Sequence, residues 1–203
     1  AKKAASAGLK VVMVEKKKLG GVCLNEGCVP SKTLLQAAKT YHHAKHGSIF
    51  GVEAGSLSFD FGKAHAHKNS VMDRMRDGIA GLMKKHKVEV IEGEATLVKG
   101  GFSVNGETHE AENILHCTGS SPTIPPIPGI EAEHIVDSTG ILNNETLPEN
   151  LVIVGGGVIG CEFACVYASV GVPVTVLEAM PEICPNLDSE ISAILRKELE
   201  KKG

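Results

Sequence analysis

Two cysteines, Cys23 and Cys28, lie five positions apart in the segment GGVCLNEGCVPSK, residues 20 to 32. Five positions along an ideal helix separate Cα atoms by roughly 8 to 9 Å, which exceeds the limit of about 7 Å for a disulfide. A bond between the two thiols therefore requires a non-helical turn. We expect Asn25-Glu26-Gly27 to form it, because asparagine and glycine favour turns.

Lys32 supplies a charge close to this pair. If a helix begins near Cys28, Lys32 lies one turn later on the same face. A nearby ammonium group and a helix N-terminus both lower the pKa of a thiol, which favours a working redox pair. Two alternatives stay open. A structural disulfide across so short a loop adds little to a chain of this size, and a zinc site normally needs a second cysteine pair, which does not follow.

A second motif, GGGVIG at residues 155 to 160, follows a predicted strand at 151–154 and opens a predicted helix at 158–170. This strand–GxGxxG–helix arrangement is typical of dinucleotide binding, because the glycines let a pyrophosphate approach the helix N-terminus. The candidate binding residues of the loop are Gly155, Gly157, Val158, Ile159 and Gly160.

Glu178 closes the strand that follows this helix. A carboxylate there accepts hydrogen bonds from the adenine-ribose hydroxyls and repels a 2′-phosphate. The next residues, AMPEICPNLD, contain no arginine, so the sequence favours NAD over NADP.

Residues 4–15 and 167–178 resemble each other, and Gly8 to Glu15 has the same spacing as Gly171 to Glu178. Each copy matches the helix-to-strand junction of a βαβ unit. Projecting the second copy's glycine loop onto the first places the first loop before residue 1. We therefore expect an α/β fold with two Rossmann-like dinucleotide-binding domains, both incomplete: residues 1–121, lacking the first strand and glycine loop, and residues 122–203, an N-terminal half. The proline-rich stretch at 120–129 marks the boundary.

Other elements follow from hydrophobic spacing and turn residues. Helices are predicted at 32–47, 69–86 and 188–203, and strands at 88–91, 95–98, 102–104 and 114–117. The histidines at 42, 43, 46, 65 and 67 are interpreted as a solvated polar face, and no metal site is predicted.

The amino-acid composition limits the classes of protein to which the chain can belong. The chain has 203 residues, 42% hydrophobic residues and a net charge of −3, which indicates a soluble globular protein and argues against a general nucleic-acid or membrane-surface binder. No apolar run approaches the roughly 18 residues of a membrane span. Six cysteines are too few for a secreted disulfide scaffold.

The cysteine segment, together with VVMVEK, HCTGSSP and VIVGGGVIGCEFA…VTVLE in the same order, resembles the flavin disulfide reductases over essentially the whole chain. The pattern is closest to the members that oxidise dihydrolipoamide. The resemblance implies an enzyme that uses FAD and NAD and passes electrons through a Cys23–Cys28 disulfide. Mercuric and glutathione reductases remain alternatives within the family. A non-catalytic nucleotide-binding fragment is the alternative of another class.

The resemblance also implies roles for single residues. Cys23 exchanges with the substrate, Cys28 lies against the flavin, Lys32 lies near the reactive flavin nitrogen, and Glu162 orients Lys32. Glu15 holds the FAD ribose. Further FAD contacts are implied at Lys16, Gly20, Gly21, Val22, Ala95, Thr118, Gly119 and Ser120. Cys117 stands where the family often has alanine, and we expect its thiol to pack in the core.

The implied partners are the lipoyl domains of 2-oxo acid dehydrogenase complexes and a second copy in a homodimer. The implied location is the cytoplasm, with the mitochondrial matrix as alternative. In the family, the acid–base histidine comes from a C-terminal domain of the partner subunit, so none of the nine histidines here is assigned that role. The chain alone is expected to be inactive.

Overall fold

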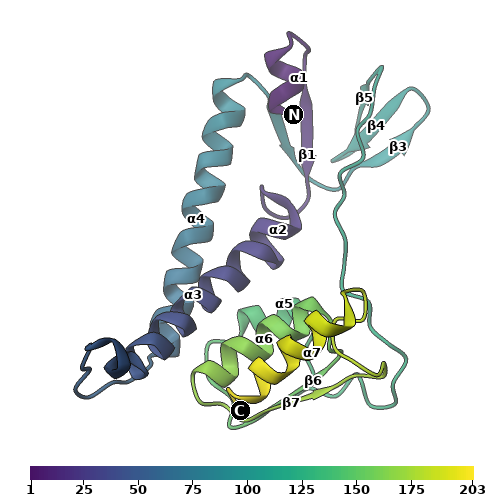
Figure 1. The fold of residues 1–203 in the computed structure, drawn as a ribbon. Helices are drawn as coiled ribbons and strands as arrows, with labels where there is room; N and C mark the ends of the chain where they lie inside the picture. The colour runs from purple at the N-terminus through teal and green to yellow at the C-terminus, as the bar shows by residue number, and fades with distance from the viewer.

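The computed structural model describes residues 1–203 and contains three small sheets (Figure 1). Two of them are parallel pairs and the third is antiparallel. The parallel pairs are β1 (Val12–Glu15) with β2 (Glu89–Glu92), and β6 (Leu151–Val154) with β7 (Val174–Leu177); the antiparallel sheet is β3 (Thr96–Val98), β4 (Gly101–Val104) and β5 (Glu107–Glu110).

Most residues in regular secondary structure are helical, and helices connect the two strands of each parallel pair (Figure 1). They are α1 (Lys2–Ser6), α2 (Gly21–Glu26), α3 (Cys28–Lys45), α4 (Phe61–Lys85), α5 (Ser138–Asn143), α6 (Val158–Ser169) and α7 (Ser189–Glu200), with a 3₁₀ turn η1 (Gly47–Phe50). No helix combines the length and the apolar character that a bilayer span requires.

The two repeated junctions adopt the same local conformation. Gly8 follows α1 with φ +90°, and Gly171 follows α6 with φ +95°, a left-handed conformation that favours glycine after a helix. A strand follows each glycine, and each strand has a parallel partner. Strands β6 and β7 with α6 between them form one βαβ unit, as the repeat predicted.

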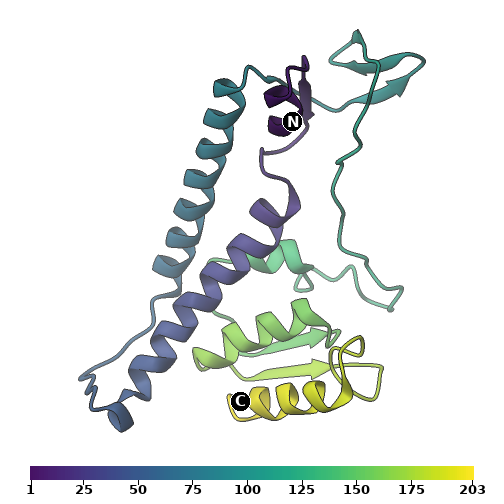
Figure 2. The ribbon, with the colours of Figure 1, turned by 45° about the horizontal axis from the view of Figure 1, so that its top comes forward.

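The main core lies where helices of the two halves meet. Helix α3 packs against α4 and α6, and residues of α4 and α5 join the same apolar cluster. Figure 2 shows α5 and α6 beside α3. Tyr167 is fully buried at the centre, and its ring lies 5.8 Å from that of Phe61. The cluster consists of Leu34, Ala38, Phe61, Ala64, Leu142, Phe163, Val166, Tyr167 and Val172. Residues from both sides of the proline-rich stretch, and therefore from both predicted domains, share this core.

Helix α4 begins at Phe61, eight residues before the predicted start, so that prediction was wrong. The side chain of Asp60 accepts a hydrogen bond from the Lys63 N–H at 2.9 Å and caps the helix. The early turns were missed because His65 and Lys68 occupy buried positions there, which interrupts the apolar period. The prediction that His65 is solvated was also wrong, since it is 6% exposed.

The predicted strand at 114–117 is absent. Residues 111–128 contain no helix or strand, and Leu115 is 82% exposed. Cys117 is likewise exposed, so the expectation that it packs in the core was wrong. No neighbouring strand pairs with this segment, and a strand forms only where a partner satisfies its backbone groups.

Candidate active site

Cys23 and Cys28 are bonded to each other, and their Cα atoms lie 4.7 Å apart. Cys23 lies inside α2 and Cys28 is the first residue of α3. The predicted three-residue turn was wrong in extent: Asn25 and Glu26 are helical, and only Gly27 leaves the helical conformation, with φ −152° and ψ −107°. One non-helical residue is thus enough to bring the two thiols within bonding distance.

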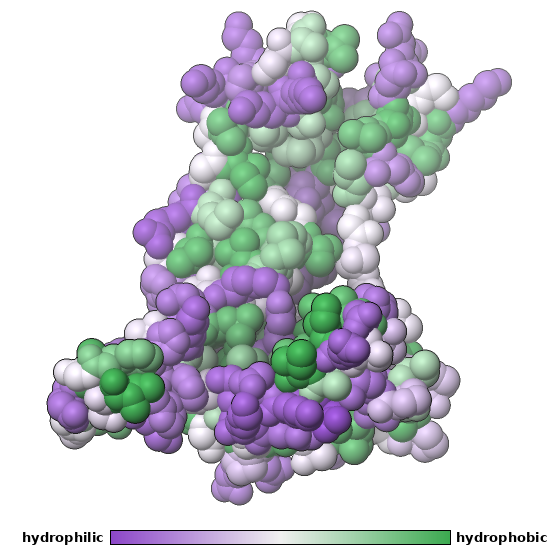
Figure 3. Space-filling model, in the orientation of Figure 1, coloured by the Kyte–Doolittle hydropathy of each residue, from purple (hydrophilic) through white to green (hydrophobic).

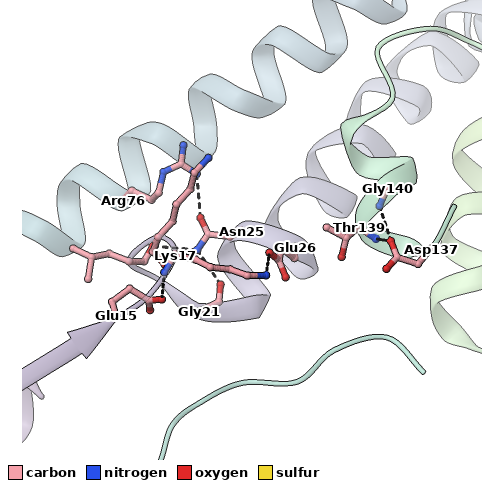
Figure 4. A network of polar contacts seen from close by, with 11 residues as sticks. Glu15, Lys17, Gly21, Asn25, Glu26, Arg76, Asp137, Thr139 and Gly140 are labelled. Atoms are coloured by element: carbon pink, nitrogen blue, oxygen red, sulfur yellow. Dashed lines mark hydrogen bonds and ion pairs between the residues drawn. The ribbon is translucent and has the colours of Figure 1, made fainter. Parts of the chain in front are cut away.

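Asn25 holds the short helix in place (Figure 4). Its side-chain amide donates to the Gly21 and Leu19 carbonyls at 3.0 and 3.1 Å. Its side-chain oxygen accepts from Arg76 of α4 at 3.0 Å. Sequence reasoning missed this contact, because Arg76 lies 51 positions away and no motif marks it.

Lys32 lies one turn after Cys28 on α3, and its Nζ atom lies 2.5 Å from Oε1 of Glu162 on α6. The predicted pair is therefore present. The Lys32 side chain is 59% exposed and that of Glu162 is 24% exposed, and such pairs contribute little to stability. The Lys32–Glu162 pair matters for position, because it joins α3, which begins at Cys28, to α6, which begins at the glycine loop.

A groove of about 880 Å³ begins at Cys28 and Lys32 and follows α3. Its far end is lined by Tyr41 and Phe59, and His67 of α4 forms part of one wall. The lining is mostly apolar or uncharged around a single ammonium group, that of Lys32. Cys28 is the only cysteine in its lining, so the groove borders the inner thiol of the pair and not Cys23.

The glycine loop leaves the start of α6 open. Gly155 has φ +111°, and no side chain caps the helix. A Cβ atom on Gly157 would meet nothing within 4 Å, whereas one on Gly160 would lie 2.1 Å from the Gly155 carbonyl oxygen. Gly157 thus leaves room in front of the helix N-terminus, and Gly160 allows close packing of helix against loop.

Glu178 directs its carboxylate at this loop. Its oxygens accept hydrogen bonds from the backbone N–H groups of Met180 at 2.8 Å and Gly156 at 2.7 Å. These bonds, that of Met180 first, hold the pKa of the Glu178 carboxyl below its usual value. The Glu178 carboxylate therefore lies beside the loop, and its role toward a ribose stays a prediction.

The predicted FAD-contacting segments meet at the carboxyl end of β1. The Glu15 carboxylate accepts from the Lys17 N–H at 2.9 Å, and Lys16 pairs with Glu94, the neighbour of Ala95, at 3.0 Å. Gly119 packs so closely on Val22 that an added Cβ would lie 2.9 Å from a Val22 methyl carbon. Gly20 and Gly21 both have positive φ. Thr118 and Ser120, which flank Gly119, are exposed.

A family model described as pyridine nucleotide-disulphide oxidoreductase matches residues 1–203. The chain belongs to this family. This membership confirms the oxidoreductase class and the Rossmann-type α/β fold predicted from the two repeated units.

The relatives of this chain include proteins named dihydrolipoyl dehydrogenase. The one from Acholeplasma laidlawii is 41% identical over 207 residues, which cover 99% of this chain and 62% of that protein. The one from Geobacillus stearothermophilus is 42% identical, and the match covers 99% of this chain and 44% of that protein. Among solved structures, the HOCl-induced flavoprotein disulfide reductase from Escherichia coli superposes with a TM-score of 0.85 at 33% identity, covering all of this chain and 44% of its own.

The present chain thus spans about half the length of most relatives that it matches. Within it, no group of three histidine, cysteine, aspartate or glutamate side chains is placed to hold a metal ion.

Proposed function

We propose that this chain is part of a dihydrolipoyl dehydrogenase, which oxidises dihydrolipoamide through the Cys23–Cys28 disulfide and reduces NAD⁺. The observation that carries the proposal is the disulfide at the start of α3, one turn from Lys32, whose partner Glu162 belongs to the helix of the glycine loop. The names of the relatives support this substrate.

The residues at the second motif fit NAD. The uncapped N-terminus of α6 offers backbone N–H groups to a pyrophosphate, and the space in front of Gly157 is open. The ionised Glu178 accepts from ribose hydroxyls and disfavours the 2′-phosphate of NADP.

The residues at the carboxyl end of β1 fit FAD. Glu15 provides a carboxylate for a ribose, and Gly20 and Gly21, with positive φ, allow close backbone approach. Lys16, Val22, Ala95 and Thr118–Ser120 complete the set. When bound, FAD supplies a two-electron carrier between the dithiol and the nicotinamide.

The two cysteines divide the thiol chemistry between them. A substrate thiolate attacks the Cys23 sulfur and breaks the disulfide, so that Cys28 leaves as a thiolate. The N-terminus of α3 and the Lys32 ammonium favour this anion. The second substrate thiol then attacks the substrate sulfur of the mixed disulfide and releases Cys23. Glu162 acts on the sulfur only through Lys32 and is a positioning residue.

We further propose the implied assembly. Residues 1–121 belong to the FAD-binding domain and residues 122–203 to the NAD-binding domain. The full-length protein acts as a homodimer in the cytoplasm, and its partners are the lipoyl domains of 2-oxo acid dehydrogenase complexes.

The test uses the full-length protein with Cys23→Ser and, separately, Cys28→Ser. Each variant is expected to lose dihydrolipoamide-driven NAD⁺ reduction by at least about 10³-fold, because each removes one half of a unit that works as a pair. Cys165→Ser, which changes a thiol on α6 outside the site, is the matched control and should keep the activity. Retention of turnover by Cys23→Ser would show that the outer thiol is assigned wrongly.

A further inference from the structure

A second pair of thiols lies beneath the glycine loop. Cys161 on α6 is 6% exposed and Cys184, in the loop after β7, is 1% exposed. Their sulfur atoms are 3.8 Å apart. Together with Ile183 they form a small apolar cluster, which Leu195 and Leu199 of α7 cover.

Both cysteines contact the carbonyl oxygen of Gly156. The Cys161 thiol donates to it at 3.3 Å, and the Cys184 backbone N–H donates to it at 2.8 Å. The N–H of the same glycine donates to Glu178. The position of Gly156 is therefore set on one side by the thiol pair and on the other by the acid that faces the nucleotide.

The backbone at Cys184 is held in an uncommon conformation. Its φ is +46°, in the left-handed region that non-glycine residues seldom adopt. Ser192 of α7 donates to the Cys184 carbonyl at 3.2 Å. These bonds keep the Cys184 sulfur next to that of Cys161.

We propose that Cys161 and Cys184 form a second, reversible disulfide when the protein meets a peroxide, and that this bond weakens nucleotide binding at the glycine loop. The second part rests on the proposed binding of NAD. Of the four free cysteines, Cys117 is exposed and Cys165 is partly buried, and only Cys161 and Cys184 have their sulfur atoms in contact.

The reaction balances with hydrogen peroxide as the oxidant. One thiolate attacks a peroxide oxygen, which gives a sulfenic acid and one water. The other thiol attacks that sulfur, forms the S–S bond and releases a second water. Two S–H bonds are lost, and the O–O bond is reduced to two molecules of water.

Burial controls the rate of this reaction. Burial, aided by the contact with Cys184, raises the pKa of the Cys161 thiol to about 12, so the thiolate is scarce while the cluster is closed. Residues 179–188 contain no helix or strand, and local opening of such a segment is the route by which peroxide reaches the sulfurs. The pair therefore reacts more slowly than the exposed Cys117.

Closing the bond shortens the sulfur–sulfur distance from 3.8 Å to about 2 Å. It removes the Cys161 S–H that donates to the Gly156 carbonyl. The loss of roughly one hydrogen bond at the loop corresponds to a rise of about fivefold in the dissociation constant of NAD⁺.

The test uses the full-length protein carrying Cys117→Ser and Cys165→Ser, so that the only free thiols of this segment are the proposed pair. After treatment with hydrogen peroxide, alkylation and peptide mapping should find the Cys161 and Cys184 peptides linked. Calorimetry should find the dissociation constant of NAD⁺ about fivefold higher than before treatment, and a dithiol reductant should restore it.

Cys184→Ser and Cys161→Ala in the same background provide the controls, and peroxide should leave their NAD⁺ affinity unchanged. Two alkylated thiols after treatment, or a linked pair with unchanged affinity, would overturn the proposal. Failure of the untreated protein to bind NAD⁺ would count against the proposed function instead, and peptide mapping would still decide whether the disulfide forms.

Discussion

Lys32 and Lys68 show how placement determines what one kind of side chain does. Lys32 is mostly exposed and pairs with Glu162. Lys68 on α4 is fully buried and donates to the carbonyl oxygen of Leu142, near the end of α5. His65 Nε2 lies 3.3 Å from the same oxygen. Burial, opposed in part by Glu145, lowers the pKa of Lys68 to about 8.

This pKa makes stability depend on pH. Lys68 has an ordinary value of 10.5 in the unfolded chain, so between about pH 8 and 10.5 the unfolded state binds more protons than the folded state. Stability attributable to Lys68 therefore rises with pH across this window, by on the order of 3 kcal/mol. We expect the unfolding free energy of the native protein, minus that of Lys68→Met, to increase in urea titrations from pH 7.5 to 10.

Lys85→Met provides the control, because Lys85 is exposed on the same helix. Its difference from the native protein should stay constant across the range. A constant difference for Lys68→Met as well would show that the Lys68 ammonium is not destabilised by burial.

The sequence predicts those residues that act as a local motif. Cys23, Cys28 and Gly160 belong to fixed spacings, and the partnership of Lys32 with Glu162 follows from the family pattern. It did not predict the burial of His65 and Lys68, because their shared acceptor lies more than 70 positions away. The neighbouring thiols of Cys161 and Cys184, 23 positions apart, became visible only in the structure, because no motif marks them.

At the scale of elements, two glycines of one loop are required for different reasons. A side chain on Gly160 would meet a backbone oxygen at 2.1 Å, whereas one on Gly157 would meet nothing. Gly160 therefore allows α6 to pack closely on the loop. Gly157 leaves space in front of the helix N-terminus.

We expect Gly160→Ala to lower the unfolding free energy by about 1–3 kcal/mol, because the clash with a backbone atom outweighs the helix propensity of alanine. Gly157→Ala should leave the unfolding free energy within about 0.5 kcal/mol and raise the dissociation constant of NAD⁺ at least tenfold. Denaturant titration and calorimetry measure the two effects. Equal losses of stability in both variants would contradict this division of roles.

Elements with a strong local signal were predicted well, and elements that depend on partners were not. The strand at 151–154 and the start of α6 at Val158 agree with the structure. The strand at 114–117 was predicted from its apolar residues, but a strand needs a neighbour and this segment has none. Helix α5 was missed, although Asp137 caps it through the Thr139 and Gly140 N–H groups (Figure 4).

Across the whole molecule, contacts between helices join the cysteine segment to the helix of the glycine loop. The core between α3 and α6 and the Lys32–Glu162 pair both join the first half to the second. The repeated βαβ pattern predicted two halves, but it carried no information about their shared core, which depends on contacts across more than 100 positions.

Apolar surface remains exposed in several places. Figure 3 shows apolar side chains over the middle of the molecule and at the tip formed by η1 at the lower left, where Ile49 and Phe50 are 81% and 82% exposed. One face of the β6–β7 sheet is exposed as well, with Val152, Val154 and Leu177 each more than half exposed. Experiments on function therefore belong to the full-length protein.

The most direct test of the redox role of Cys23 and Cys28 is to follow their thiols during anaerobic reduction. The full-length protein, loaded with FAD, is mixed with one equivalent of NADH, alkylated and mapped by mass spectrometry. We expect Cys23 and Cys28 to pass from the disulfide to two alkylated thiols, while Cys161 and Cys184 do not change. A Cys23–Cys28 disulfide that persists while NADH is consumed would contradict the proposed path between dithiol and nicotinamide.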